Sequence, residues 1–149
     1  MTEDFDKLGE PDLKLAGFQL WIHGRQFPHS EDYWDSNWLN ITAHCEDKGA
    51  SVWVRGPIIH LPEVAHLLRG AEQIYTTLIG EAELPCMEPE LELKLTAAGL
   101  GHIKMEVDIT PDNLTQQHHF IFDVDQSYLP ALLTDCRRIL TSYPIKGKP

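Results

Sequence analysis

The chain has 149 residues, of which 42% are hydrophobic and 23% are charged, and these values are typical of a globular domain rather than of a disordered, collagen-like or coiled-coil chain. A domain of this length buries roughly two-thirds of its unfolded surface, which predicts a single core. The formal net charge of -11 opposes binding to nucleic acid, because phosphate contacts need clustered Lys and Arg, and it favours a basic partner.

Residues 1–13 form an acidic lead-in with five acidic residues and one lysine, and we expect this segment to be mobile. A secretory signal would instead begin with a basic segment followed by an apolar one. Apolar runs elsewhere are far shorter than the roughly 20 residues that a membrane-spanning helix needs. We therefore expect a cytoplasmic protein with no membrane contact, made of the lead-in, a single α+β domain over residues 14–145 and a short basic tail over residues 146–149.

Alternation of apolar and polar residues predicts three strands in the first half of the domain, over residues 14–23, 37–46 and 51–55. A polar loop with Gly and Pro, residues 24–36, separates the first two strands. A helix should begin at Pro62-Glu63, because Pro is tolerated in the first turn and Glu interacts favourably with the helix dipole. Its apolar residues recur at steps of three and four as far as Ile79, and Gly80 is a suitable C-terminal cap.

The second half repeats this order. An acidic stretch from Glu81 to Glu92 is expected to lie in a loop and on an exposed strand face, and alternation predicts strands over residues 90–94, 102–108 and 118–124. Ser127 is a suitable N-cap for a last helix that Pro144 ends. The predicted fold is therefore α+β, with one antiparallel sheet of about six strands in the order βββα-βββα and two amphipathic helices on one of its faces.

No catalytic motif is found, and neither a metal nor another cofactor is predicted. Eight histidines include only one adjacent pair, and neighbouring residues on a strand point to opposite faces. One alternative stays open, a metal-dependent hydrolase with ligands on several strands, drawn from His23, His44 or His102 with Asp108. The three cysteines form no Cys-x-x-Cys pair; Cys45 and Cys136 fall in register with apolar residues, and we expect both in the core.

The polar face of the first three strands carries an unusual number of aromatic residues. Trp and Arg are common anchors of protein interfaces, and an exposed aromatic cluster generally indicates a partner. We therefore predict a non-enzymatic protein that binds another protein, with an unknown oligomeric state. Two alternatives stay open: the tryptophans pack under the 24–36 loop, or a small ligand binds under that loop between Trp34 and Trp38. The candidate contact residues are Trp21, His23, Trp38, Asn40, His44, Trp53 and Arg55.

Two short blocks resemble the WapI-like immunity protein family. The run from Trp34 to Leu39 is similar to the family pattern Trp-Asp-x-Asn-Trp-Leu, and the run from Glu88 to Leu91 is similar to Glu-Pro-x-Leu. The chain departs from the family at the start of the first helix, where it has His60-Leu61-Pro62-Glu63-Val64. The resemblance implies binding and neutralisation of a cognate toxin domain, and a nuclease with a basic site would complement the acidic chain. The block residues are expected to be structural: Trp34, Asp35, Asn37, Trp38, Leu39, Glu88, Pro89 and Leu91.

Overall fold

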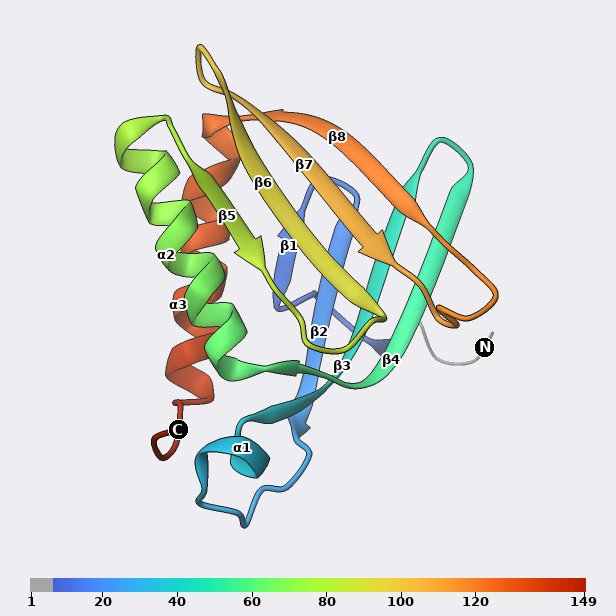
Figure 1. Cartoon of the computed structure of the whole chain (residues 1–149), viewed down its shortest axis with the longest axis vertical. Helices are drawn as coiled ribbons and strands as arrows, with labels where there is room; N and C mark the ends of the chain where they lie inside the picture. Colours follow the sequence, from blue (N-terminus) through green and yellow to red (C-terminus); the bar gives the residue numbers. More distant parts are fainter. Residues whose placement is uncertain (1–6) are drawn as a thin grey trace.

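The computed structural model describes residues 7–149 and contains two four-stranded antiparallel sheets, each followed by a helix (Figure 1). Sheet A has the order β1 (Leu13–Leu15), β2 (Phe18–Arg25), β3 (Trp38–Asp47) and β4 (Ala50–His60). Sheet B has the order β5 (Glu81–Leu84), β6 (Leu91–Gly99), β7 (His102–Ile109) and β8 (His119–Asp125). The helices are α1 (Tyr33–Ser36) between β2 and β3, α2 (Leu61–Thr77) after sheet A, the 3-10 turn η2 (Gln126–Tyr128) after sheet B, and α3 (Leu129–Ser142).

The core lies largely between the two sheets. β3 and β4 contact β7, whereas α2 packs on β5 and α3, and α3 reaches β1, so that the helix pair stands along one side of the molecule (Figure 1). The α+β class and the antiparallel pairing are confirmed, but a single sheet of about six strands beneath two helices is wrong. Each sheet buries its apolar face mainly against the other sheet, and the helices close the side where β1 and β5 form the sheet edges.

Two short edge strands account for the difference in strand number. The predicted strand over residues 14–23 is two strands, because the chain turns at Ala16-Gly17, where Ala16 has a φ of +50°. The apolar positions change phase at this turn, from Leu13 and Leu15 to Phe18 and Leu20, and the predicted single strand passed over this break. β5 comes from the acidic stretch that was expected to be partly loop: Ala82 and Leu84 point into the core, while Glu81 and Glu83 alternate with them on the other side.

The helix ends differ from the predicted ones. Pro62 lies in the first turn of α2 as predicted, but the helix ends in a left-handed residue, Leu78, rather than at Gly80. Ser127 is not the N-cap of the last helix. Its backbone N–H donates to the carboxylate of Asp125, the N-cap of η2, at 2.8 Å. Helix α3 starts only at Leu129. Within residues 7–149, no helix is both long and apolar enough to cross a membrane.

Candidate functional site

The outer face of sheet A is the side opposite the core, and it brings most of the predicted contact residues together. Cross-strand register places Trp21 beside Thr42 and Thr42 beside Arg55, while Gln19, His44 and Trp53 form the next row. We define this outer face by Gln19, Trp21, His23, Asn40, Thr42, His44, Ser51, Trp53 and Arg55.

Trp53 stands at the centre of a stack on this face. Its ring lies 3.9 Å from that of His44 at an interplanar angle of 17°, and 5.8 Å from that of Trp21 at 18°. Trp21 is only 7% exposed although it is outside the core cluster, and its indole N–H donates to the Gly9 carbonyl at 3.0 Å. The expectation of an exposed aromatic cluster is therefore wrong for Trp21 and for the buried His44, because the stack and the segment at Gly9 cover them; Trp53 is half-buried.

The polar groups around the stack divide into a covered and an exposed set. The His44 ring nitrogens lie 3.2 Å from Gln19 Oε1 and 2.7 Å from Ser51 Oγ, and burial lowers the pKa of His44, which favours a neutral imidazole. In contrast, His23 and Arg55 are exposed and meet at one hydroxyl. His23 Nε2 lies 2.7 Å from Thr42 Oγ1, and Arg55 Nε donates to the same oxygen at 3.2 Å. Together with the exposed Ser51, these two side chains form the accessible polar part of the face.

Trp38 belongs to a different aromatic cluster. Its ring centroid lies 4.8 Å from that of His60, on whose ring Trp34 stacks at 5.5 Å and 11°. Asn40, also in the predicted contact set, is half-buried opposite Pro57 on β4. The structure thus divides the predicted contact residues between the outer face and the cluster at His60.

This second cluster borders an open surface hollow of about 250 Å³, which we call the motif hollow. Trp34 and Met87 line it with exposed fractions of 54% and 55%. Trp38 is not among its lining residues. Of the two tryptophans that were predicted to wall a ligand pocket, Trp34 therefore lies at this hollow and Trp38 does not. The lining residues are Tyr33, Trp34, His60, Pro62, Glu63, His66, Arg69, Pro85 and Met87.

Glu63 lies buried at the edge of the motif hollow and joins two segments. Its carboxylate accepts the His60 N–H at 2.8 Å and the Met87 N–H at 2.9 Å. Burial raises the pKa of Glu63 above its ordinary value of 4.5, although both hydrogen bonds act against this. The sequence interpretation treated Glu63 only as a partner of the helix dipole. Its place three residues after His60 is the spacing of a capping box, a signal that could have identified this contact.

Asn37 explains why the first family block needs an amide at its centre. The fully buried side chain donates to the carbonyls of Tyr33 at 2.8 Å and Lys146 at 2.9 Å. Its oxygen accepts the Lys146 N–H at 2.9 Å and Arg25 Nη1 at 3.3 Å. All four hydrogen-bonding positions of the amide are used, and the block thereby ties α1 to β2 and to the C-terminal segment.

We expect Asn37→Asp to lower the free energy of unfolding by about 2 kcal/mol, because a carboxylate cannot donate to the two carbonyls that Asn37 now satisfies. Urea unfolding followed by circular dichroism measures this loss. Asp35→Asn is the matched control: Asp35 is exposed in the same short helix, and its stability should stay within about 0.5 kcal/mol of the original. Equal stability of the two variants would contradict a structural role for the Asn37 amide.

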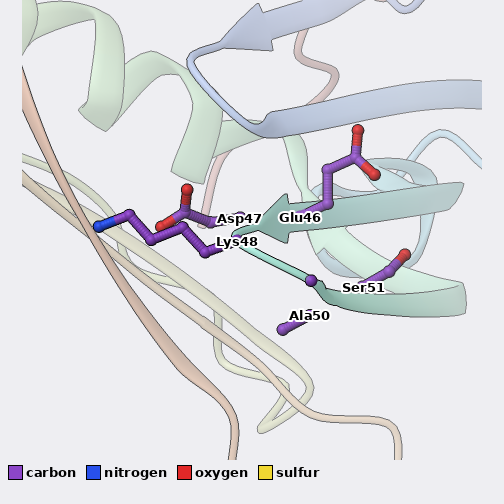
Figure 2. A pocket seen from close by; sticks show the side chains of 6 residues that line it. Glu46, Asp47, Lys48, Ala50 and Ser51 are labelled. Carbon is purple, nitrogen blue, oxygen red and sulfur yellow. The ribbon is translucent and has the colours of Figure 1, made fainter.

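The depression at the β3–β4 turn and the candidate metal ligands do not form a further site. Among the residues that the structure describes, residues 46–51 of the β3–β4 hairpin line an open depression of about 410 Å³ at its turn. In Figure 2, Glu46 and Lys48 point in different directions. Over the described part of the chain, no three His, Cys, Asp or Glu side chains are placed to hold a metal ion. The alternative metal ligands are not brought together, since His23 and His44 lie on sheet A whereas His102 and Asp108 lie at opposite ends of β7.

The cysteines behave as core residues. Cys45 and Cys136 are fully buried, as predicted, and neither forms a disulfide. Burial raises the pKa of each thiol to about 12, so both stay protonated at neutral pH. The half-buried Cys86 thiol also has a raised pKa because of burial, with Glu63 contributing.

The structure defines the chain as an α+β protein of two packed antiparallel sheets with a helix pair at one side, and its outer surfaces carry the candidate sites. The family model described as "Immunity protein WapI-like family" matches residues 12–144. The chain therefore belongs to the WapI-like immunity protein family, as the two motif blocks predicted. Membership in a family of immunity proteins indicates a protein-binding role directed against a toxin.

Two solved structures are similar to this chain at low sequence identity. The plant transcriptional regulator PBF-2 is 8% identical, with a TM-score of 0.51 over 85% of this chain and 75% of that chain, and this likeness concerns the fold alone. WHY3 from Arabidopsis thaliana is 9% identical, with a TM-score of 0.47 over 88% of this chain and 85% of that chain. No match was found among the curated proteins.

Proposed function

We propose that this chain is a non-enzymatic cytoplasmic protein that neutralises a cognate toxin domain by binding it. The observation that carries the proposal is the family match over residues 12–144, which spans both sheets and both long helices. The net charge of -11 further favours a toxin with a basic surface, since opposite charges accelerate encounter and favour the correct partner. A nuclease is the toxin class that we propose, because its nucleic-acid site must be basic.

The outer face of sheet A is the contact surface that we propose for the toxin. His23, Ser51 and Arg55 are its exposed polar groups, and Trp53 is the least buried ring of the stack with Trp21 and His44. Trp21 and His44 hold the Trp53 ring from two directions, which fixes its position before a partner arrives. A positioned tryptophan beside an accessible arginine is a typical centre of an interface. Trp38 and Asn40 lie towards the family block at one end of this surface.

Co-expression tests the proposed function as a whole. If a neighbouring gene encodes a C-terminal domain that fits the proposed toxin, this domain is produced with and without the chain, and cell growth and complex formation are measured. We expect the chain to restore growth and to elute with the toxin domain in size-exclusion chromatography. Persistent toxicity together with separate elution would refute neutralisation by binding.

We expect Arg55→Ala and His23→Ala each to weaken binding of the toxin domain about tenfold or more, since exposed interface anchors typically contribute over 1 kcal/mol. Both side chains are exposed, so thermal unfolding should change little. Isothermal titration calorimetry measures the affinity. Arg137→Ala, on α3 with a side chain that is 56% exposed, is the control and should bind as the original chain does. Unchanged affinity of both sheet A variants would exclude this face as the contact surface.

Binding of a small ligand in the motif hollow is a second candidate function. It is favoured by the exposure of Trp34 and Met87 on the lining. Pockets for drug-sized ligands usually measure roughly 300–1,000 Å³, so a hollow of about 250 Å³ suits only a smaller molecule. Intrinsic fluorescence across a ligand panel tests this, with Trp34→Phe as the reference that lacks the reporting indole. A spectrum that no ligand changes, or that changes equally in Trp34→Phe, would count against the hollow.

A further inference from the structure

An exposed apolar surface, which we call the apolar cap, is formed by Tyr75, Leu78 and Ile79 at the end of α2 together with Leu100 at the β6–β7 turn. Both segments lie at the same end of the molecule (Figure 1), and the Ala97 N–H donates to the Gly80 carbonyl at 3.0 Å where they meet. Ile79 is 65% exposed and Leu100 is 100% exposed. The cap therefore places several large apolar side chains in water at one end of the molecule.

Backbone geometry makes these leucines more unusual. Leu78 has a φ of +60° and Leu100 a φ of +54°, a left-handed conformation that glycine or asparagine adopts at lower cost. Leu100 also lies between Gly99 and Gly101, both with positive φ, and it buries no surface within this chain. Neither burial nor local conformational preference explains a leucine there. An exposed apolar side chain on a strained turn is better explained by contact with another molecule.

The negative charge around the apolar cap indicates what kind of molecule would contact it. Glu81 begins β5 directly after Ile79-Gly80, and Asp125 pairs with His102 beside the β6–β7 turn. The exposed side of sheet B continues from this rim with further carboxylates, and its two lysines are already near carboxylates, Lys94 at 3.6 Å from Glu81 and Lys104 at 3.5 Å from Glu106. The additional acidic residues on this side are Glu83, Glu92, Glu106, Asp108 and Asp123.

We propose that the apolar cap is a docking surface for a basic protein, with apolar side chains of the partner on Ile79 and Leu100 and its Lys and Arg residues on the acidic rim. A second copy of this chain would bring the same carboxylates into the contact, and like charges would oppose it. The proposal rests on the proposed function, in that the toxin domain is the basic protein. It adds a contact surface separate from the outer face of sheet A.

The test uses the full chain and, as probe, an inactive form of the toxin domain encoded beside its gene. The double variant Ile79→Ser/Leu100→Asn should bind at least tenfold more weakly in calorimetry. Its midpoint of urea unfolding should stay equal or rise, because asparagine tolerates the left-handed turn. The matched control is Leu114→Asn, which changes an 89% exposed leucine in the loop between β7 and β8 and should leave the affinity unchanged.

The outcomes separate the two proposals. If the original chain binds the probe and the double variant binds equally well, the cap proposal is overturned while toxin binding stands. If the original chain does not bind the probe, the proposed function fails and the cap proposal fails with it. A dimer of the original chain that Leu100→Asn dissociates would show that the occupant is a second copy and would also overturn the proposal.

Charge gives an independent readout. Affinity of the original chain should fall as NaCl rises, and Asp123→Lys, which alters a side chain that is 84% exposed, should slow association several-fold. The counterpart is Glu31→Lys before α1, where the side chain is 80% exposed. Association that is independent of salt, or that Glu31→Lys slows as much as Asp123→Lys does, would overturn a basic partner at the cap.

Discussion

Glu63→Ala is expected to lower the free energy of unfolding by about 4 kcal/mol. The Glu63 carboxylate accepts one backbone N–H from His60 and one from Met87, and each buried donor left without an acceptor costs roughly 1–3 kcal/mol. The variant also loses the capping box that begins α2. The first turn of α2 and the segment before β6 would therefore loosen together, a change that urea unfolding and amide hydrogen exchange can both measure.

A surface carboxylate on the same helix provides the control for Glu63. Glu72 lies 3.2 Å from Arg137 with both side chains about half exposed, and such pairs contribute roughly 0–1 kcal/mol. Glu72→Ala should therefore cost at most about 1 kcal/mol. If Glu63→Ala costs no more than this control, the carboxylate is not an essential link between the two segments.

The raised pKa of the Glu63 carboxyl group should make the free energy of unfolding fall as pH rises. Burial raises the pKa of Glu63 above 4.5 in the folded protein, so between 4.5 and that higher value the folded state binds the proton more tightly than the unfolded state does. Stability contributed by this group is complete below pH 4.5 and declines as pH rises through the window. The free energy of unfolding of the original chain, relative to Glu63→Gln at each pH, should fall over the same interval; a rise would contradict the assigned cause.

Strongly periodic segments were predictable from sequence because period and burial agree in them. Strand β7 was predicted over residues 102–108 and covers His102–Ile109, and α2 was predicted from an apolar recurrence that the structure buries as far as Ile74. The pattern could not tell what covers an apolar strand face, since a second sheet and a helix demand the same alternation. A phase break between Leu15 and Phe18 does separate Leu13–Leu15 from Phe18–Arg25 in the sequence, but the single predicted strand over residues 14–23 passed over it.

From the sequence, the candidate sites were predictable only where their residues lie on the same face of neighbouring strands. Alternation alone placed Trp21, His44 and Trp53 on a common side, and cross-strand register keeps them there. It could not reveal that Gly9 would meet the indole of Trp21, because that contact joins the lead-in to β2. The motif hollow is drawn from α1, the start of α2 and the segment at Met87, and such long-range convergence leaves no local period in the sequence.

The contact between α2 and β5 should be sensitive to a single side chain. A Cβ added at Gly70 would lie 2.6 Å from Ala82 Cα, 2.8 Å from Ala82 Cβ and 2.8 Å from the Glu81 carbonyl oxygen. These neighbours are mainly backbone, so they can give way only if β5 moves off the helix. We therefore expect Gly70→Val to lower the free energy of unfolding by roughly 3–4 kcal/mol through overpacking, at the upper end of such effects.

Arg69→Val separates this steric effect from helix propensity. Arg69 is the adjacent, exposed residue of α2, so the same β-branched side chain there should cost only about 0.5 kcal/mol. Removing a glycine from a helix interior should by itself raise the free energy of unfolding. A large decrease in Gly70→Val would therefore indicate the clash with Ala82. Differential scanning calorimetry of the two variants measures both effects. Similar melting temperatures would show that α2 and β5 are not held at the close distance that Gly70 permits, and that the edge of sheet B can shift without cost.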